Sequence, residues 1–193
     1  MWVLKDCYLT LTRFCEYLTI IARFYMNNKI DFTCGRDYPL ITNASPNPYY
    51  VEILQGLYSG QSSELSAILQ YVYQSSALHS NNKEVSYILK QIAIVEMHHL
   101  ELLANAIISF GGLPYYINKD NQTFCTNNIC YCTNLRCVIE QDLKDELSAI
   151  EFYTKSANLI QNESLKQLLL TIAEDEKKHS RILSSLLDEL NCY

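Results

Sequence analysis

Two Glu-x-x-His motifs, Glu96 with His99 and Glu176 with His179, are the residues whose types and spacing best suit chemistry. Residues three apart lie on one face of a helix, so each pair can chelate one metal ion through a carboxylate and an imidazole. A single motif of this kind is weak evidence, because it usually belongs to a solvated helix face. Here the two copies align without gaps, as IAIVEMHHLELL (residues 92–103) and IAEDEKKHSRIL (residues 172–183). The pair of motifs therefore indicates two halves of one site.

A second repeated phrase lies upstream of each motif. The pentapeptide ELSAI begins at Glu64 and again at Glu146, and each copy is followed three residues later by a tyrosine, Tyr71 and Tyr153. The repeating unit thus reads Glu-x-x-Ala-Ile-x-x-Tyr and then Glu-x-x-His, on stripes otherwise made of Leu, Ile, Val and Ala. Each unit is predicted to be a helical hairpin that contributes two glutamates and one histidine to the protein core.

Buried carboxylates in this number need a compensating charge. Without one, each would cost several kcal/mol or take up a proton. Two divalent cations would balance four ionised glutamates and leave both imidazoles neutral. Mixed carboxylate and imidazole ligands favour iron or manganese over calcium or a structural zinc. The predicted metal ligands are Glu64, Glu96, His99, Glu146, Glu176 and His179.

The tyrosines of the repeat and the two other histidines are not predicted to be metal ligands. The hydroxyls of Tyr71 and Tyr153 are expected to hydrogen-bond the ligating carboxylates, although core packing is the commoner role of such tyrosines. His98 and His79 fall outside the repeat. We interpret His98 as a surface or supporting residue and His79 as a loop residue.

Apolar residues recur at intervals of three and four from residue 59 onward, which predicts helices. The first spans residues 62–78. The second opens at a capping box formed by Asn81 and Glu84 and ends at FGGLP, where Gly111 and Gly112 can adopt a left-handed cap. The third spans residues 135–160, and Asn162 caps a fourth that continues to about residue 190. Short loops make each pair antiparallel, and the connection over residues 111–134 can return along the bundle. This predicts an all-α, ferritin-like four-helix bundle.

Composition and charge narrow the functional classes. The chain has 193 residues, is 49% hydrophobic and 19% charged, and carries a net charge of −6. These values exclude a disordered chain and argue against a nucleic-acid partner. The apolar stretch over residues 7–26 is interrupted by Arg13, Glu16 and Arg23, so we predict neither a membrane segment nor a signal peptide. The protein is expected in the cytoplasm with its eight cysteines mostly as free thiols. Nothing in residues 1–37 belongs to the repeat, so they are predicted to be an N-terminal extension and residues 38–193 the metal-binding bundle.

Residues 38–190 resemble the ferritin-like superfamily, specifically its rubrerythrin and manganese-catalase-like branches. The six predicted ligands match the family motif residue by residue, and NPYYVEILQGLYSGQSSELSAILQY resembles the start of manganese-catalase-like domains. The resemblance implies a di-iron or dimanganese centre that reduces or disproportionates hydrogen peroxide. It departs from rubrerythrins in two places. No Cys-x-x-Cys pair occurs, so an external electron donor is expected, and Ala149 stands where rubrerythrins carry an extra glutamate.

Alternatives remain open at this point. The expected function is a peroxide-consuming oxidoreductase in oxidative-stress defence, with hydrogen peroxide or dioxygen as substrate, in a homo-oligomer of two or more chains. A ferroxidase or iron-storage bundle, and a structural coat-type protein with a relict site, are the other candidates. The crossover cysteines, spaced C-x4-C-x-C-x4-C, allow a thiolate metal site, a redox pair or no function. They are Cys125, Cys130, Cys132 and Cys137.

Overall fold

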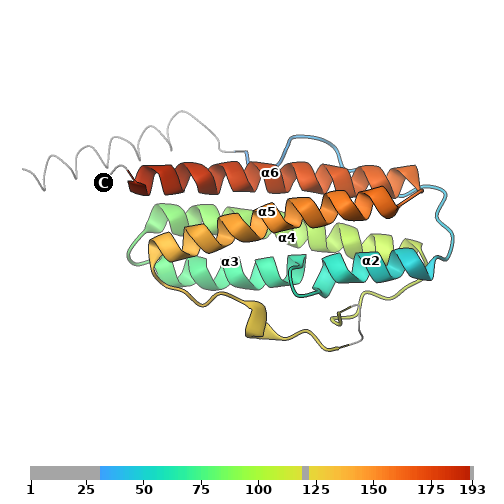
Figure 1. Ribbon diagram of the computed structural model, residues 1–193, viewed down its shortest axis with the longest axis horizontal. Coiled ribbons are helices and arrows are strands. Elements are labelled where there is room, and N and C mark those ends of the chain that lie inside the picture. The colour runs from blue at the N-terminus through green and yellow to red at the C-terminus, as the bar shows by residue number, and fades with distance from the viewer. Residues whose placement is uncertain (1–30, 119–121, 192–193) are drawn as a thin grey trace, which may run out of the picture. The chain divides into compact units, whose positions relative to one another are not determined.

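The computed structural model describes residues 31–118 and 122–191. These residues form α-helices, one short 3-10 helix and an isolated bridge between Ile117 and Thr123. The helices are α2 (Pro48–Ser59), α3 (Glu64–Leu78), α4 (Lys83–Ser109), α5 (Leu135–Leu159) and α6 (Glu163–Asn191), with the 3-10 helix at Thr126–Asn128. Figure 1 shows α2 and α3 following one another along one edge of the bundle. Together they form the first of its four helices, so the predicted all-α four-helix bundle is confirmed.

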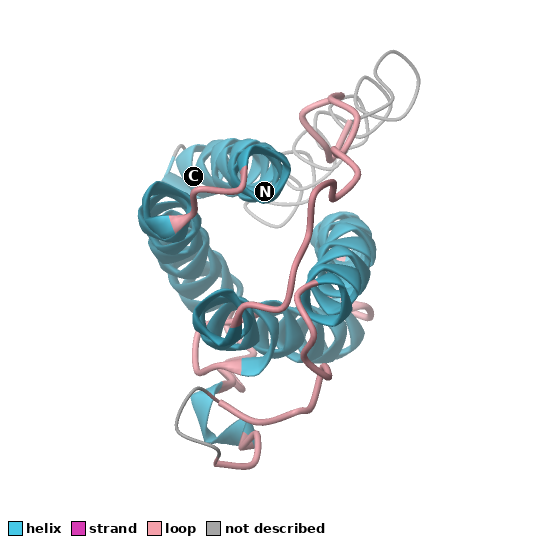
Figure 2. Ribbon diagram, turned by 90° about the vertical axis from the view of Figure 1, so that its right-hand side faces the viewer, coloured by secondary structure: helices cyan, strands magenta, loops and turns pink. Residues whose placement is uncertain are grey.

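Two helical hairpins make up the bundle. α3 packs against α4, and α5 packs against α6. Viewed along the bundle, the helices surround a common interior (Figure 2). Leucine and isoleucine side chains fill one part of that interior, because the apolar stripe of each helix faces inward. Among the fully buried ones are Leu54, Leu103, Leu165, Leu169 and Ile172. The metal-site residues lie on the same stripes.

Asparagine side chains begin three of the long helices. Asn82 accepts from the Val85 N–H at 3.0 Å, and Asn134 and Asn162 make the same bond at the starts of α5 and α6. Such bonds satisfy amide groups that have no partner inside the helix. The cap of α4 is therefore Asn82 rather than the predicted Asn81. At the other end of α4, Gly111 adopts a φ of 84°, as its predicted left-handed cap requires.

The helix α2 lies outside the four segments predicted from the sequence. It begins with Asn47 as cap and Pro48 in its first turn, both favourable for a helix start. The helix ends at Gly60, where a Cβ atom would come within 2.3 Å of the Gly56 carbonyl oxygen. Glycine therefore permits the break, and Ser63 restarts the helix by accepting from the Ser66 N–H.

A short segment before α2 packs on the bundle. We call residues 32–38 the strap. Its first residue, Phe32, is buried, and Cys34 donates its N–H to Asp175 of α6. Residues from Phe32 onward belong to one compact unit. We therefore propose that the bundle domain begins at Phe32 rather than at the predicted residue 38, since the strap contacts α6. The remainder of the predicted extension, residues 1–30, lies outside the described residues.

The crossover between the hairpins runs along α2 and α3. Gln55 donates to the carbonyl oxygens of Tyr115 and Ile117, and Tyr58 stacks on Tyr116 with ring centroids 5.6 Å apart. Further along, Gln70 of α3 accepts from the Cys130 N–H at 2.7 Å. These contacts fix the connection as a layer on the first helix.

Among the residues that the structure describes, one helix is long and apolar enough to cross a membrane by length and composition. It is α4, and 44% of its most apolar window is buried inside the bundle. The apolar character of α4 follows from its place in the core of the bundle.

Candidate metal centre

The six predicted ligands converge at the middle of the bundle. They come from four helices and none is more than 4% exposed. Their oxygen and nitrogen atoms form two groups, in each of which all donor atoms lie within 4.8 Å of one another. One group contains Glu64, Glu96, His99 and Glu176, and the other contains Glu96, Glu146, Glu176 and His179. Glu96 and Glu176 belong to both groups, so they are the carboxylates that two ions would share.

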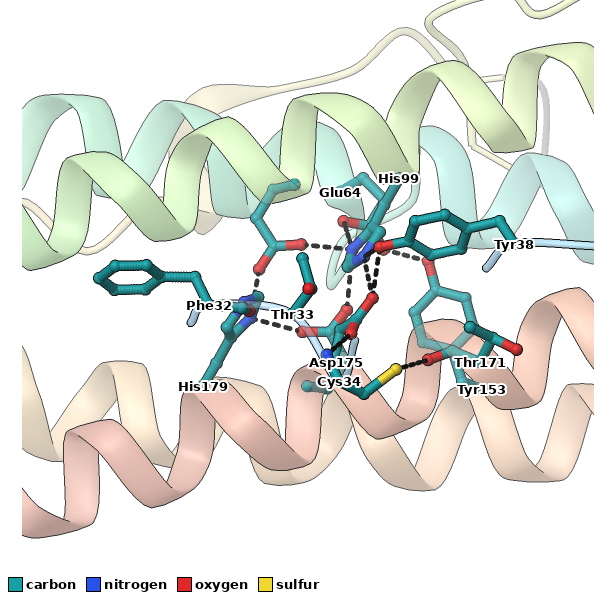
Figure 3. Close-up of polar contacts among 12 residues, drawn as sticks. Phe32, Thr33, Cys34, Tyr38, Glu64, His99, Tyr153, Thr171, Asp175 and His179 are labelled. Atoms are coloured by element: carbon teal, nitrogen blue, oxygen red, sulfur yellow. Dashed lines mark hydrogen bonds and ion pairs between the residues drawn. The ribbon is translucent and has the colours of Figure 1, made fainter. Parts of the chain in front are cut away.

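The ring of His99 presents one nitrogen to the carboxylates and the other to a partner outside the cluster. Its Nδ1 lies 2.9 Å from Glu96 Oε2 and 3.2 Å from Glu176 Oε1. Its Nε2 lies 3.0 Å from Asp175 Oδ2 (Figure 3). Because an ionised carboxylate only accepts hydrogen bonds, Nε2 carries the proton. When His99 is neutral, as a metal ligand must be, the Nδ1 lone pair faces the cluster.

His179 has the same arrangement in the other half. Its Nδ1 lies 3.0 Å from Glu96 Oε1 and 3.1 Å from Glu176 Oε2. Its Nε2 lies 2.9 Å from the carbonyl oxygen of Phe32 (Figure 3). A carbonyl oxygen can only accept, so Nε2 is again the donor and Nδ1 faces the carboxylates. Both imidazoles are thus fixed in the orientation that a metal ligand needs.

Two tyrosines cross between the hairpins to reach the outer glutamates. Tyr71 of α3 donates to Glu146 of α5, and Tyr153 of α5 donates to Glu64 of α3. Each tyrosine therefore holds the glutamate of the opposite repeat. The predicted hydrogen bonds from tyrosine to ligating carboxylates are present in this crossed form.

The carboxylates divide into two electrostatic classes in the metal-free centre. Burial, reinforced by the charges of Glu96 and Glu176, raises the pKa of Glu64 and Glu146 well above the usual range. Burial raises the pKa of Glu96 as well, but the neighbouring His179 and His99 have the larger effect, and the pKa of Glu96 is lowered overall. The histidines respond in the opposite sense. Burial lowers the pKa of His99, yet its hydrogen bonds to Asp175 and to the glutamates raise it well above 6.5.

The donor set fits a pair of divalent cations. Four carboxylates and two imidazole nitrogens point at one another in the buried interior of the bundle, where like charges repel strongly. Within the described residues, Glu176 Oε1 is buried and makes no hydrogen bond of acceptable geometry, although His99 Nδ1 lies 3.2 Å away. A buried carboxylate oxygen in that state is satisfied by a cation. Oxygen and nitrogen ligands of this mixture suit iron or manganese.

Asp175 is a supporting residue that the motif search does not identify. It is fully buried, and its carboxylate accepts from Cys34 N and from the Tyr38 hydroxyl, each at 2.5 Å. Burial raises its pKa, but the hydrogen bonds from His99, Tyr38 and Cys34 prevail and lower it to about 2. Asp175 is therefore ionised and holds the His99 ring. Its signal in the sequence was its position directly before Glu176, on the same apolar stripe.

A cavity of about 80 Å³ leads to the carboxylates between α3 and α5. Its inner wall includes all four glutamates and both tyrosines of the centre. Its outer wall contains Gln61 and Ser62, from the break between α2 and α3, together with Ala149 and Phe152 of α5. The cavity has room for a few water-sized molecules. The cavity therefore lies between the exposed residues at the α2–α3 break and the four glutamates.

A second buried polar group lies beside that cavity. Asp142 of α5 is fully buried and accepts from Gln70 Nε2 at 2.9 Å. Its Oδ2 and both amide atoms of the buried Gln74 lack a hydrogen-bond partner among the described residues. Burial raises the pKa of Asp142 to about 7. No motif pointed to Asp142, because it lies outside the repeated phrases.

The crossover cysteines do not form a metal cluster in the described residues. Neither group that could hold an ion includes a cysteine. A hydrogen bond with Cys132 raises the pKa of the Cys137 thiol to about 11, so that thiol is protonated. Of the other predicted residues, His98 lies on the surface of α4, 3.9 Å from Glu101, and His79 follows α3.

Comparison with known families decides the classification. The sequence pattern of the family described as rubrerythrin matches residues 57–187, which include all six predicted ligands. The chain belongs to the rubrerythrin family. Among curated proteins, none matches the sequence of this rubrerythrin-family protein.

Solved structures share the fold. KatB, a manganese catalase from Anabaena, is 22% identical with a TM-score of 0.72, covering 81% of this chain and 79% of KatB. The bacterioferritin of Desulfovibrio desulfuricans, solved with its diiron site in different catalytic states, is 25% identical with a TM-score of 0.64. That match covers 75% of this chain and 81% of the bacterioferritin. The bacterioferritin BfrA of Mycobacterium tuberculosis is 24% identical with a TM-score of 0.66, over 76% and 89% of the two chains. These likenesses identify a ferritin-like di-metal carboxylate fold.

Proposed function

We propose that this protein is a di-iron or dimanganese oxidoreductase that consumes hydrogen peroxide in oxidative-stress defence. The observation that carries the proposal is the pair of four-residue clusters sharing Glu96 and Glu176, which a cavity connects to the surface. Glu64 and His99 would complete one ion site, and Glu146 and His179 the other. A resident pair of iron or manganese ions would supply the electron chemistry by changing oxidation state.

The protein's own residues then perform three tasks. The cavity admits a molecule as small as peroxide and limits the water around it. The crossed tyrosines keep their protons and orient the outer carboxylates, because burial raises the pKa of Tyr71 and of Tyr153 well above 10. Asp175 and Phe32 fix the histidine rings, so little reorganisation is needed when the charge at the centre changes.

Catalase, peroxidase and ferroxidase activities are separable by what each consumes. Protein loaded with manganese or with iron is given hydrogen peroxide, with and without a reducing dye. Oxygen release without the dye identifies a catalase, and dye-dependent loss of peroxide identifies a peroxidase. Oxidation of excess Fe²⁺ by dioxygen, with retention of the product, would instead identify the iron-handling function that the bacterioferritin likeness favours.

The Glu96→Ala variant tests the assignment of the site. Removing a carboxylate that both ions would share should abolish binding of the pair. Peroxide consumption should fall by more than about 100-fold, because loss of a residue that only supports a metal ligand already costs about 10–100-fold. Glu101→Ala is the matched control, because Glu101 lies on the same helix with 72% of its side chain exposed. Equal turnover by the wild type and Glu96→Ala would refute the proposed function.

The setting of the protein is also part of the proposal. We place it in the cytoplasm, since the five cysteines of the described residues are free. A homo-oligomer is supported by apolar side chains on the outer faces of α3 and α4: Val72, Ile94 and Met97 are 43–49% exposed. Sedimentation of the intact protein measures the oligomeric state, and a monomer at micromolar concentration would contradict this part.

A further inference from the structure

The two repeats differ at one position of the metal centre. Asp175 directly precedes Glu176 in α6, and it accepts the Nε2–H of His99, which belongs to α4. The aligned position of α4, directly before Glu96, is Val95. Valine has no hydrogen-bond acceptor in its side chain. The symmetry of the repeat therefore supplies a partner for His99 and none for His179.

The strap supplies the missing partner. The carbonyl oxygen of Phe32 lies 2.9 Å from His179 Nε2. The Phe32 side chain is 9% exposed, so packing anchors this part of the strap on the bundle. A backbone carbonyl that is buried away from water ordinarily needs a hydrogen-bond donor. The contact thus satisfies both groups and sets the orientation of the His179 ring.

The same strap also supports the other histidine through Asp175. The Cys34 N–H donates to Asp175 Oδ1 and the Tyr38 hydroxyl to Asp175 Oδ2, each at 2.5 Å. The Tyr38 hydroxyl lies 3.3 Å from His99 Nε2 as well. Figure 3 shows Phe32 beside His179, and the Cys34 backbone and the Tyr38 side chain beside Asp175.

We propose that the strap is a positioning element of the metal centre, in which Phe32 orients His179 directly and Tyr38 and Cys34 orient His99 through Asp175. This inference rests on the proposed di-metal function, and it adds residues that neither the repeat nor the matched family region contains. The two ions depend on different parts of the strap. Disturbing one part should therefore weaken one ion more than the other.

Calorimetric titration of the full chain with Mn²⁺ tests the proposal. Phe32→Gly removes the anchor of the carbonyl, and Tyr38→Phe removes one hydrogen bond to Asp175 while keeping the ring. Each variant should bind one ion about 10–100-fold more weakly, as loss of an outer partner of a metal ligand usually does, and keep the other near its wild-type affinity. Tyr49→Phe, a tyrosine that is 51% exposed on α2, is the control.

A rescue variant separates orientation of the ring from damage to the fold. Val95 occupies the position in the first repeat that Asp175 occupies in the second. Val95→Asp should therefore place a carboxylate beside His179, as Asp175 lies beside His99. Val95→Asp alone should keep both ions, and added to Phe32→Gly it should restore the weakened ion at least about tenfold. Wild-type affinities in Phe32→Gly, or no gain in the double variant, would overturn the role of the strap. A wild-type protein that binds no pair of ions would instead refute the di-metal function itself.

Discussion

Glu64 and Glu146 hold their protons differently from the two glutamates shared between the ion sites. Burial raises the pKa of both, and the charges of Glu96 and Glu176 add to the effect. A carboxyl group whose folded pKa lies above its unfolded value makes the folded state lose stability as pH rises from the unfolded value toward the folded one. In the metal-free protein this loss is complete once the pH exceeds the folded pKa of each acid.

Replacing both outer glutamates by glutamine should therefore stabilise the metal-free protein. The double variant keeps an oxygen that accepts from Tyr71 and Tyr153, but it removes two buried acids. We expect its melting temperature at pH 8, measured with a chelator present, to exceed that of the wild type by about 4 °C or more, which corresponds to 1–2 kcal/mol. Binding of two ions should be lost. A variant that melts lower and still binds both ions would show that these glutamates are not ligands.

Residue identities predicted most of the centre but not its supports. All six predicted ligands lie together because their repeat spacing fixes their helix faces. In the aligned repeats, Asp175 stands where the first repeat has Val95. This difference indicates a role for Asp175 only once the structure shows that His99 of α4 lies opposite it. The contact between the Phe32 carbonyl and His179 could not be predicted from the sequence. Every residue has a backbone carbonyl, and only the fold determines which of them lies beside the histidine.

At the scale of the helices, α3 and α5 meet at a buried acid, Asp142, whose Oδ2 has no hydrogen-bond partner among the described residues. Asp142 is fully buried there, with Gln70 as a donor and with Gln74 and Asp145 close by. Its pKa rises from 3.8 to about 7, mainly through burial. Folding therefore favours the protonated acid, and the α3–α5 contact is stable below about pH 4 and weakens as pH rises toward 7.

Asp142→Asn should remove this pH dependence. The unfolding free energy of the variant relative to the wild type is expected to rise between pH 4 and pH 8 by up to about 4 kcal/mol, since about three pKa units at 1.4 kcal/mol each are involved. Urea unfolding at both pH values measures the difference. The control is Glu140→Gln on the same helix, where the side chain is 53% exposed. A relative stability independent of pH would contradict the buried acid.

The helices themselves were predictable to different degrees. α4, α5 and α6 were predicted within about three residues of their bounds, because each is long, amphipathic and opened by an asparagine. α2 has only 12 residues, and the lead-in sequence carries a proline and several tyrosines, so its periodicity is weak. The break at Gly60 depends on the close approach to Gly56, which is a property of the folded backbone.

At the scale of the whole molecule, the position of the domain boundary has a direct test. A chain that begins at Phe32 keeps the strap, whereas a chain that begins at Tyr38 lacks the acceptor of His179 and one donor to Asp175. We expect the longer chain to bind two ions as the full protein does. The shorter chain should bind at least one ion about 10–100-fold more weakly. Metal content after dialysis measures both, and equal content in the two would restore the boundary at residue 38.

The unequal partners of the two histidines make the halves of the centre electronically different. His99 donates to an ionised carboxylate, whereas His179 donates to a neutral carbonyl. An imidazole that donates to a carboxylate is the more basic ligand, so His99 would bind a metal ion more strongly than His179. The His99 half would therefore hold a divalent cation more tightly than the His179 half, and Mn²⁺ added below one equivalent should fill the His99 half first.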